Sequence, residues 1–223
     1  MNPRVVLFDV DGTLADSNYL HVDAWTRAFE RVGHPVDAWR VHRAIGMDGD
    51  RLVATLLPDA DVDVRARATE LHTELYRWAS YRLRPLDGGR ELVERVKNEG
   101  ALVVLASSAS SEELTLLRRA LEVDDLLDGA TTSASVDTAK PEPDIVTAAL
   151  DLVGARAEDA VMIGDSTWDM RAATRAGVTA LAVLSGGTGR DELIAAGAHS
   201  VYDDPRDLLE HLDETPIRAL LGR

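Results

Sequence analysis

The sequence of 223 residues has no cysteine, a shortage of cations and no long apolar run. Without cysteine, disulfides, zinc–thiolate sites and a cysteine nucleophile are excluded, and a reducing cytosol is compatible. Lysine and arginine number 24 against 39 aspartates and glutamates, for a formal net charge of −15, which disfavours non-specific binding to nucleic acid. No apolar segment approaches membrane-spanning length. We therefore expect no nucleic-acid or membrane partner and a cytoplasmic location.

The most informative motif is Asp9-Val10-Asp11-Gly12-Thr13, which directly follows the apolar run of residues 5–8. Residues i and i+2 of a strand point the same way, so Asp9 and Asp11 can face one reaction centre. Two carboxylates this close repel unless a cation neutralises them or one keeps its proton. The alternative for so short a motif is a solvated acidic turn.

Residues 17–83 have the periodicity of helices. Apolar residues recur at helical spacing over 21–33 and 64–78, and a shorter helix over 52–57 ends at Pro58. The segment holds Trp25, Trp39 and Trp78, which we interpret as core residues rather than as a surface for stacking bases.

Beyond Pro85 the pattern alternates between strands and helices. Apolar strands are predicted over 102–106, 161–163 and 180–184, and helices over 145–153 and 170–176, with a further helix ending near Gly100. Strands buried on both faces and separated by helices indicate an α/β fold, a parallel sheet with helices on both sides.

In such folds ligands collect at the carboxyl ends of the strands. Those ends carry the Asp9–Asp11 pair, then Ser107 and Ser108, then Asp165. This convergence favours one shared site over an isolated acidic turn, although the two serines are also typical helix caps.

Two further motifs refine the site. Asp165 is followed four residues later by Asp169, where the first helical turn can return it to the same side, and this oxygen-rich set suits Mg²⁺ better than an EF-hand calcium site. Lys140 begins Lys140-Pro141-Glu142-Pro143, whose prolines stiffen the backbone and can fix where the lysine points. The alternative for Lys140 is a solvated loop charge.

Taken in order, Asp-x-Asp-Gly-Thr, a strand-end serine, Lys-Pro and Gly-Asp-x-x-x-Asp resemble the haloacid dehalogenase superfamily. The resemblance covers nearly the whole chain and implies a Rossmann-like catalytic core of residues 1–16 and 84–223 with an inserted helical cap, residues 17–83. The tail over 176–201 looks like that of phosphoglycolate phosphatase relatives. The glycine-rich run 186–189 therefore needs no nucleotide, and the dinucleotide fingerprint is absent.

The resemblance also implies a mechanism. Asp9 is the nucleophile that forms an aspartyl-phosphate, and Asp11 protonates the leaving alcohol and then deprotonates water. Mg²⁺ is bound by the Asp9 carboxylate, the Asp11 backbone carbonyl and Asp165, with Asp169 orienting these ligands from behind. Lys140 holds phosphoryl oxygens and offsets the negative site.

Ser107, the backbone that follows it at Ser108, and Gly12 complete the expected phosphate-binding set. A dehalogenase of this superfamily lacks the second aspartate, so Asp11 argues against that branch.

The β-phosphoglucomutase branch is the main competitor, because residues 16–25 look like the mutase hinge and first cap helix. His21 there is either a packing residue or a catalytic gate. Two departures favour hydrolysis: Gly164 stands where the mutase has glutamate, and Ser110 where it has lysine. We expect a Mg²⁺-dependent phosphatase acting on a small phosphorylated metabolite.

A non-catalytic phosphate-binding regulator is the more distant alternative. Substrate contacts are expected from the cap, with Arg51 and the neighbours of Gly46 as candidates.

Overall fold

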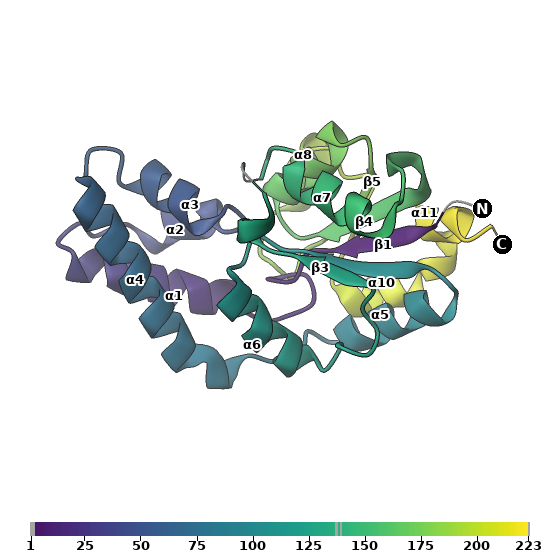
Figure 1. Cartoon of the computed structure of the whole chain (residues 1–223), viewed down its shortest axis with the longest axis horizontal. Helices are drawn as coiled ribbons and strands as arrows, with labels where there is room; N and C mark the ends of the chain where they lie inside the picture. The colour runs from purple at the N-terminus through teal and green to yellow at the C-terminus, as the bar shows by residue number, and fades with distance from the viewer. Residues whose placement is uncertain (1–2, 137, 139, 223) are drawn as a thin grey trace.

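A six-stranded parallel sheet forms the centre of the computed structural model, which describes residues 3–136, 138 and 140–222 (Figure 1). The strand order is β3-β2-β1-β4-β5-β6. The strands are β1 (Val5–Phe8), β2 (Leu102–Ala106), β3 (Gly129–Thr131), β4 (Ala160–Gly164), β5 (Thr179–Val183) and β6 (Ser200–Tyr202). Because β1 pairs in parallel with both β2 and β4, the residues that follow these three strands meet at one edge of the sheet.

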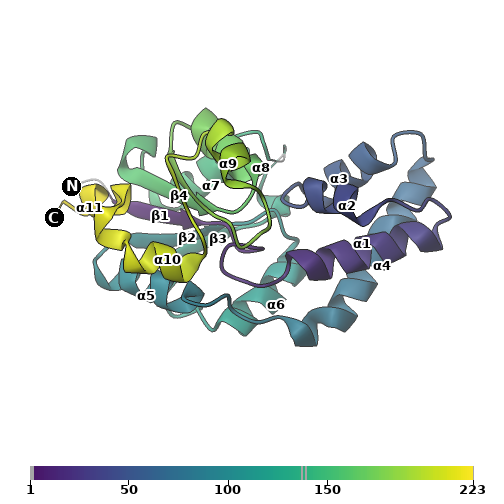
Figure 2. The ribbon, with the colours of Figure 1, turned by 180° about the vertical axis from the view of Figure 1, so that it is seen from behind.

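Helices cover both faces of the sheet (Figures 1 and 2). One face carries α5 (Gly89–Asn98), α6 (Ser111–Leu121), α10 (Pro205–Glu210) and α11 (Pro216–Leu220), and the other carries α7 (Asp144–Val153), α8 (Thr167–Arg175) and α9 (Arg190–Ala195). Alternate strand residues serve the two faces, so that Phe8 packs with the first group and Leu7 with the second. The predicted α/β fold with a Rossmann-like parallel sheet is confirmed.

Four helices between β1 and α5 form a group that we call the helical lobe: α1 (Asn18–Arg31), α2 (Ala38–Ala44), α3 (Gly49–Leu56) and α4 (Val62–Ala79). It has a hydrophobic core of its own, which includes Trp25, Phe29, Leu52 and Tyr76. In both views the helical lobe lies at the end of the sheet opposite the two termini, beyond the carboxyl ends of the strands (Figures 1 and 2).

Short 3-10 turns connect several elements: η1 (Ser80–Arg82), η2 (Ser133–Ser135), η3 (Ala157–Asp159) and η4 (Leu212–Glu214). The chain passes between sheet and helical lobe twice, and the two crossings lie side by side. The Asp16 N–H donates to the Arg84 carbonyl over 3.0 Å, and the Arg84 guanidinium pairs with the Asp16 carboxylate at 2.6 Å. In the described part of the chain no helix combines the length and the apolarity that a bilayer crossing requires.

Two of the three tryptophans predicted as core residues lie at the surface. Trp25 is 3% exposed, but Trp39 and Trp78 are each 68% exposed. The buried residues of α2 are Val41 and Ala44, and Trp39 lies two positions earlier, on the other side of the helix. In α4 the buried stripe shifts to Tyr76 and Ala79 in the last turn, because a seven-residue spacing drifts around a helix of 3.6 residues per turn.

Four helices outside the helical lobe, α6, α9, α10 and α11, and two strands, β3 and β6, were not predicted from the sequence. α6 begins with a capping box in which the Ser110 hydroxyl accepts from the Glu113 N–H and the Glu113 carboxylate accepts from the Ser110 N–H. This Ser-x-x-Glu pattern was a readable signal for a helix start. The strands β3 and β6 have three residues each, too few to display a period.

Gly88 follows the second crossing and lies just before α5. Its φ is +75°, and a Cβ there would lie 2.6 Å from the Arg206 Cα in α10. The conformation and the close approach of two backbones both require glycine. Gly33, at the end of α1, has a similar φ of +79° but open space around it.

We predict that Gly88→Ala lowers the free energy of unfolding by about 2 kcal/mol or more, since left-handed strain adds to an overlap with fixed backbone. Gly33→Ala is the matched control and should lose only the strain, roughly 1 kcal/mol. Urea titrations followed by circular dichroism measure both losses. Equal losses would show that the contact with α10 contributes nothing.

Candidate active site

The site begins at the end of β1, where the chain leaves the sheet through residues 9–15. The Asp9 N–H donates to the Ile163 carbonyl over 2.9 Å and so continues the pairing with β4. The chain then turns, with the Gly12 N–H bonded to the Ala15 carbonyl at 2.9 Å. The Gly12 N–H is thus used within the turn, and the expected contact of Gly12 with phosphate stays a prediction.

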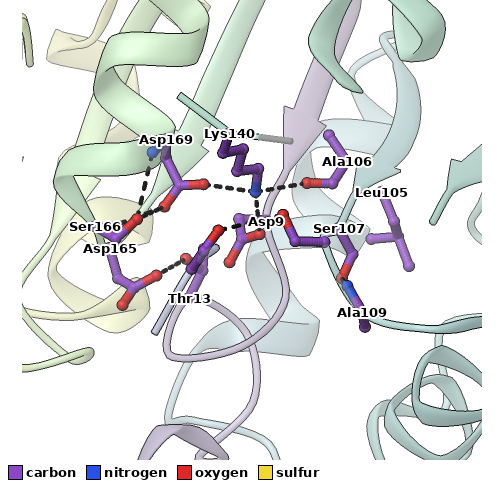
Figure 3. A network of polar contacts seen from close by, with 12 residues as sticks. Asp9, Thr13, Leu105, Ala106, Ser107, Ala109, Lys140, Asp165, Ser166 and Asp169 are labelled. Atoms are coloured by element: carbon purple, nitrogen blue, oxygen red, sulfur yellow. Dashed lines mark hydrogen bonds and ion pairs between the residues drawn. The ribbon is translucent and has the colours of Figure 1, made fainter. Parts of the chain in front are cut away.

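Lys140 is fully buried and lies between two carboxylates (Figure 3). Its ammonium Nζ is 2.6 Å from Asp9 Oδ1 and 2.6 Å from Asp169 Oδ1, and it donates to the Ala106 carbonyl over 3.0 Å. Burial lowers the pKa of Lys140, but Asp169 and Asp9 outweigh it and the net pKa is raised. Lys140 is therefore a fixed cation at the ends of β1 and β2 rather than a solvated loop charge.

Three buried carboxylates gather beside this cation. Oxygens of Asp9, Asp165 and Asp169 all lie within 4.8 Å of one another. Burial and the neighbouring carboxylates raise the pKa of Asp9 well above its usual range, and burial followed by Asp169 raises that of Asp165 to about 8. One lysine does not neutralise the group, so a second cation fits it. An all-oxygen donor set suits a hard ion such as Mg²⁺.

Neutral donors hold Asp165 in this group. Thr13 Oγ1 donates to Asp165 Oδ1 over 3.2 Å, and the Asn18 amide donates to Oδ2 over 2.9 Å. Thr13 belongs to the turn after β1, whereas Asn18 is the first residue of α1. The position of this carboxylate thus depends on both the sheet and the helical lobe.

The two carboxylate oxygens of Asp169 have different partners. Its Oδ2 accepts from the Ser166 N–H at 3.1 Å and the Ser166 hydroxyl at 2.6 Å in the capping box that starts α8, while Oδ1 faces Lys140. A Cβ on Gly164 would lie 2.5 Å from the Asp169 Cβ, so this approach requires glycine at 164. The expected return of Asp169 to the site is observed, and it reaches Lys140 directly.

Asp11 points to a different set of partners. Its Oδ1 accepts from the Ser17 hydroxyl at 2.5 Å and lies 3.3 Å from His21 Nε2. Burial raises the pKa of Asp11, but His21 and the hydrogen bonds outweigh it, so that the net pKa is lowered. Asp11 is therefore held as a carboxylate by the start of the helical lobe.

A line of buried polar groups continues from His21. His21 Nδ1 lies 3.1 Å from His72 Nε2, and His72 Nδ1 lies 3.8 Å from Glu113 Oε1 in α6. Asp11 raises the pKa of His21 against the effect of burial, whereas burial and His21 lower that of His72 well below its usual range. A protonated His21 thus donates to Asp11 and to a neutral His72.

His21, His72 and Glu113 also carry ligand atoms close enough together for a metal. The two histidine rings, however, are nearly parallel, with 16° between their planes and 5.3 Å between their centres. His21 Nδ1 and His72 Nε2 are hydrogen-bonded to each other at 3.1 Å, so these two nitrogens already have a partner. We interpret His21 and His72 as a hydrogen-bonded pair, with Glu113 at the longer distance of 3.8 Å from His72.

Ser107 and Ser108 follow β2, as predicted, but neither caps α6, whose N-cap is Ser110. Ser107 is buried, and its hydroxyl accepts from the Ala109 N–H at 3.1 Å (Figure 3). The Ser108 hydroxyl donates to the Gly46 carbonyl of the helical lobe over 3.2 Å. Ser107 thus orders the turn after β2, and Ser108 links that turn to the helical lobe.

A cavity of about 540 Å³ opens over these groups. Its described lining comes from the sheet, with Asp9, Asp11 and Lys140, and from the helical lobe, with Trp25 and the segment around Gly46. Arg51, a candidate contact from the sequence, is not among the described lining residues.

Several site residues escaped the sequence analysis. Thr13 belongs to the Asp-x-Asp-Gly-Thr motif and only its role was missed, but nothing in the sequence placed Asn18, His72 or Glu113 at the site. Asn18 reads as an ordinary helix-start residue, and the other two lie far from the motifs in sequence.

The protein thus has a Rossmann-like sheet whose strand ends carry a group of carboxylates. Lys140 contacts two of them, and a cavity lies above the group. A family model for haloacid dehalogenase-like hydrolases matches residues 6–183, and the chain belongs to this family. The resemblance noted in the sequence is confirmed.

The chain is similar to named relatives over most of its length. It is 32% identical to a phosphoglycolate phosphatase of Rhodospirillum rubrum, covering 91% of this chain and 88% of the relative. It is 27% identical to a phosphorylated carbohydrates phosphatase of Thermotoga maritima, covering 95% and 99%. A solved hydrolase from Pseudomonas syringae has 37% identity and a TM-score of 0.91, covering 95% and 98%. The family and these relatives identify an enzyme of the phosphatase or phosphomutase type.

We predict that the metal-free protein loses stability through Asp165 as the pH rises from about 4 to 8. The pKa of Asp165 is near 3.8 when unfolded and about 8 when folded, so in this interval the folded state keeps a proton that the unfolded state has released. Asp165→Asn should remove this dependence. Its stability relative to the parent should rise by roughly 3–4 kcal/mol between pH 5 and pH 8 in chelator.

Urea titrations at the two pH values measure this difference. Asp151→Asn, on the exposed side of α7, is the control and should follow the parent at both pH values. If the stabilities of Asp165→Asn and the parent change equally between the two pH values, the pKa of Asp165 is not raised in the folded protein.

Proposed function

We propose that this chain is a Mg²⁺-dependent phosphatase that hydrolyses a small phosphomonoester through an aspartyl-phosphate on Asp9. The observation that carries the proposal is the buried Lys140, 2.6 Å from both Asp9 and Asp169 at the floor of the cavity. A cation locked against a carboxylate at strand ends suits a reaction that moves a highly charged phosphoryl group.

In the proposed first step an Asp9 carboxylate oxygen attacks phosphorus, and the bond between phosphorus and the leaving alcohol oxygen breaks. Asp11, a carboxylate at rest, first takes a proton from His21 Nε2, 3.3 Å from its Oδ1, and passes it to that oxygen, so that Asp11 is a carboxylate again after this step. In the second step Asp11 takes a proton from water, whose oxygen attacks phosphorus and releases Asp9. The lowered pKa of Asp11 keeps its carboxylate free to accept this proton, which it can return to His21.

Asp9, Asp165 and the Asp11 backbone carbonyl would hold the metal, with Asp169 beside them. Mg²⁺ bound there supplies positive charge that offsets the crowded carboxylates and the phosphoryl oxygens. Lys140 keeps Asp9 in place, and Ser107, Ser108 and Gly12 are the proposed phosphate-binding residues in the turns after β2 and β1.

We further propose that residues 17–83 act as a cap on the core of residues 1–16 and 84–223. The paired crossings at Asp16 and Arg84 support these boundaries, because the two connections lie together and can bend as one hinge. The cavity lined from both sides supports closure of the cap over the substrate.

We predict that Asp9→Asn abolishes Mg²⁺-dependent release of phosphate from p-nitrophenyl phosphate, because the amide keeps the volume and loses the nucleophile. The loss should reach about a thousandfold or more, at the scale seen when a nucleophile is removed. Circular dichroism of the variant should match the parent, and Asp151→Asn should keep full activity. Near-normal turnover by folded Asp9→Asn, or full parent activity in excess chelator, would overturn the proposal.

A phosphomutase is the second candidate, since the family and relatives support either type. The contacts of Gly164 and Ser110 favour the hydrolase: Asp169 occupies the space that a side chain at 164 would need, and Ser110 caps α6. We predict that β-glucose 1-phosphate with a bisphosphate primer yields inorganic phosphate if it reacts. Stoichiometric conversion to glucose 6-phosphate without phosphate release would establish the mutase instead.

A further inference from the structure

The part of the cavity beyond the reaction centre is strongly acidic. Its described lining includes three carboxylates besides Asp9 and Asp11: Asp48 and Asp50 at the start of α3, and Glu113 on α6. α3 and α6 belong to the helical lobe and to the sheet domain, so the two lobes both contribute negative charge (Figure 1).

The cations of this lining are already engaged by the catalytic carboxylates. Lys140 contacts Asp9 and Asp169, and His21 lies against Asp11. Among the described lining residues, no other lysine or arginine is present. A phosphoryl group therefore finds a cation at the floor of the cavity, but a second anion on the leaving group finds none there.

The hydrogen bonds that two of these carboxylates, Glu113 and Asp48, accept come from neutral groups. Glu113 Oε2 accepts from the Ser110 N–H, and the pKa of its neighbour His72 is lowered, so that this neighbour is neutral. Asp48 Oδ1 accepts from the Arg51 N–H at the start of α3, a neutral donor. Hydroxyls of Thr69 and Thr73 and the indole of Trp25 complete this side with neutral groups.

We infer that the enzyme selects phosphomonoesters whose leaving alcohol is uncharged or carries a protonated amine, and that Asp48, Asp50 and Glu113 exclude leaving groups bearing a carboxylate or a second phosphate. The inference rests on the proposed phosphatase function and names its substrate class. A carboxylate entering beside these residues meets like charge in a partly enclosed cavity, whereas an ammonium group gains attraction.

Three two-carbon esters of similar size test the inference: O-phosphoethanolamine, 2-hydroxyethyl phosphate and phosphoglycolate. With saturating Mg²⁺ we expect kcat/KM for phosphoglycolate to be at least about tenfold below that for 2-hydroxyethyl phosphate, and that for O-phosphoethanolamine to equal or exceed it. The preference should weaken as salt concentration rises. Equal or better hydrolysis of phosphoglycolate overturns the inference.

Charge-removing variants identify the residues responsible. Asp48→Asn, Asp50→Asn and Glu113→Gln keep the side-chain size, and the first and third keep their capping acceptors. Each should raise the ratio of kcat/KM for phosphoglycolate to that for 2-hydroxyethyl phosphate by about three- to tenfold, and lower the ratio for O-phosphoethanolamine. Asp59→Asn, an exposed loop carboxylate outside the cavity lining, makes the same charge change and should alter neither ratio.

The results distinguish failure of the proposed substrate preference from failure of the proposed phosphatase function. Hydrolysis of all three esters with ratios that none of the three variants changes overturns the inference and leaves the phosphatase in place. Failure of the parent on all three esters and on p-nitrophenyl phosphate overturns the proposed function, and the inference falls with it.

Discussion

The buried contact of Lys140 with Asp9 and Asp169 is the interaction on which the site depends. Taking an ammonium group and carboxylates out of water is expensive, and such pairs add little to stability relative to apolar packing. We therefore interpret the contact as catalytic rather than stabilising. Lys140 supplies one positive charge to the three carboxylates Asp9, Asp165 and Asp169, which is too little to neutralise them. Burial, followed by the neighbouring Asp169 carboxylate, raises the pKa of Asp165 to about 8.

The fold supplies this arrangement by parallel pairing. Because β2, β1 and β4 run the same way, their carboxyl ends bring the Ala106 carbonyl, Asp9 and Asp165 to one edge. The first turn of α8 returns Asp169, and glycine at 164 allows its close approach. The core thus fixes the groups that every phosphomonoester would meet, on the proposed mechanism.

Much of this was predictable from the sequence, for a physical reason. The central strands are continuous apolar runs, and the polar residues that follow each run lie at one edge of a parallel sheet, so Asp9, Ser107 and Asp165 could be placed together. Exposure of Trp39 and Trp78 was not predictable from spacing, because the partner that covers each helix face is set by tertiary packing. The His21–His72–Glu113 line joins α1, α4 and α6, and no local pattern links those helices.

Asp11 and Asp9 are held in place by different parts of the protein. Asp9 is held by Lys140 within the core, whereas Asp11 is held by Ser17 and His21, at the start of the helical lobe. If residues 17–83 move as a cap, Asp9 keeps its partners in every position of the cap, but Asp11 loses its partners when the lobe swings away. On the proposed mechanism the nucleophile is always ready and the proton-transfer group is placed only when the lobe is closed. An acid–base group tied to the element that closes over the substrate restricts turnover to the closed, water-excluding state.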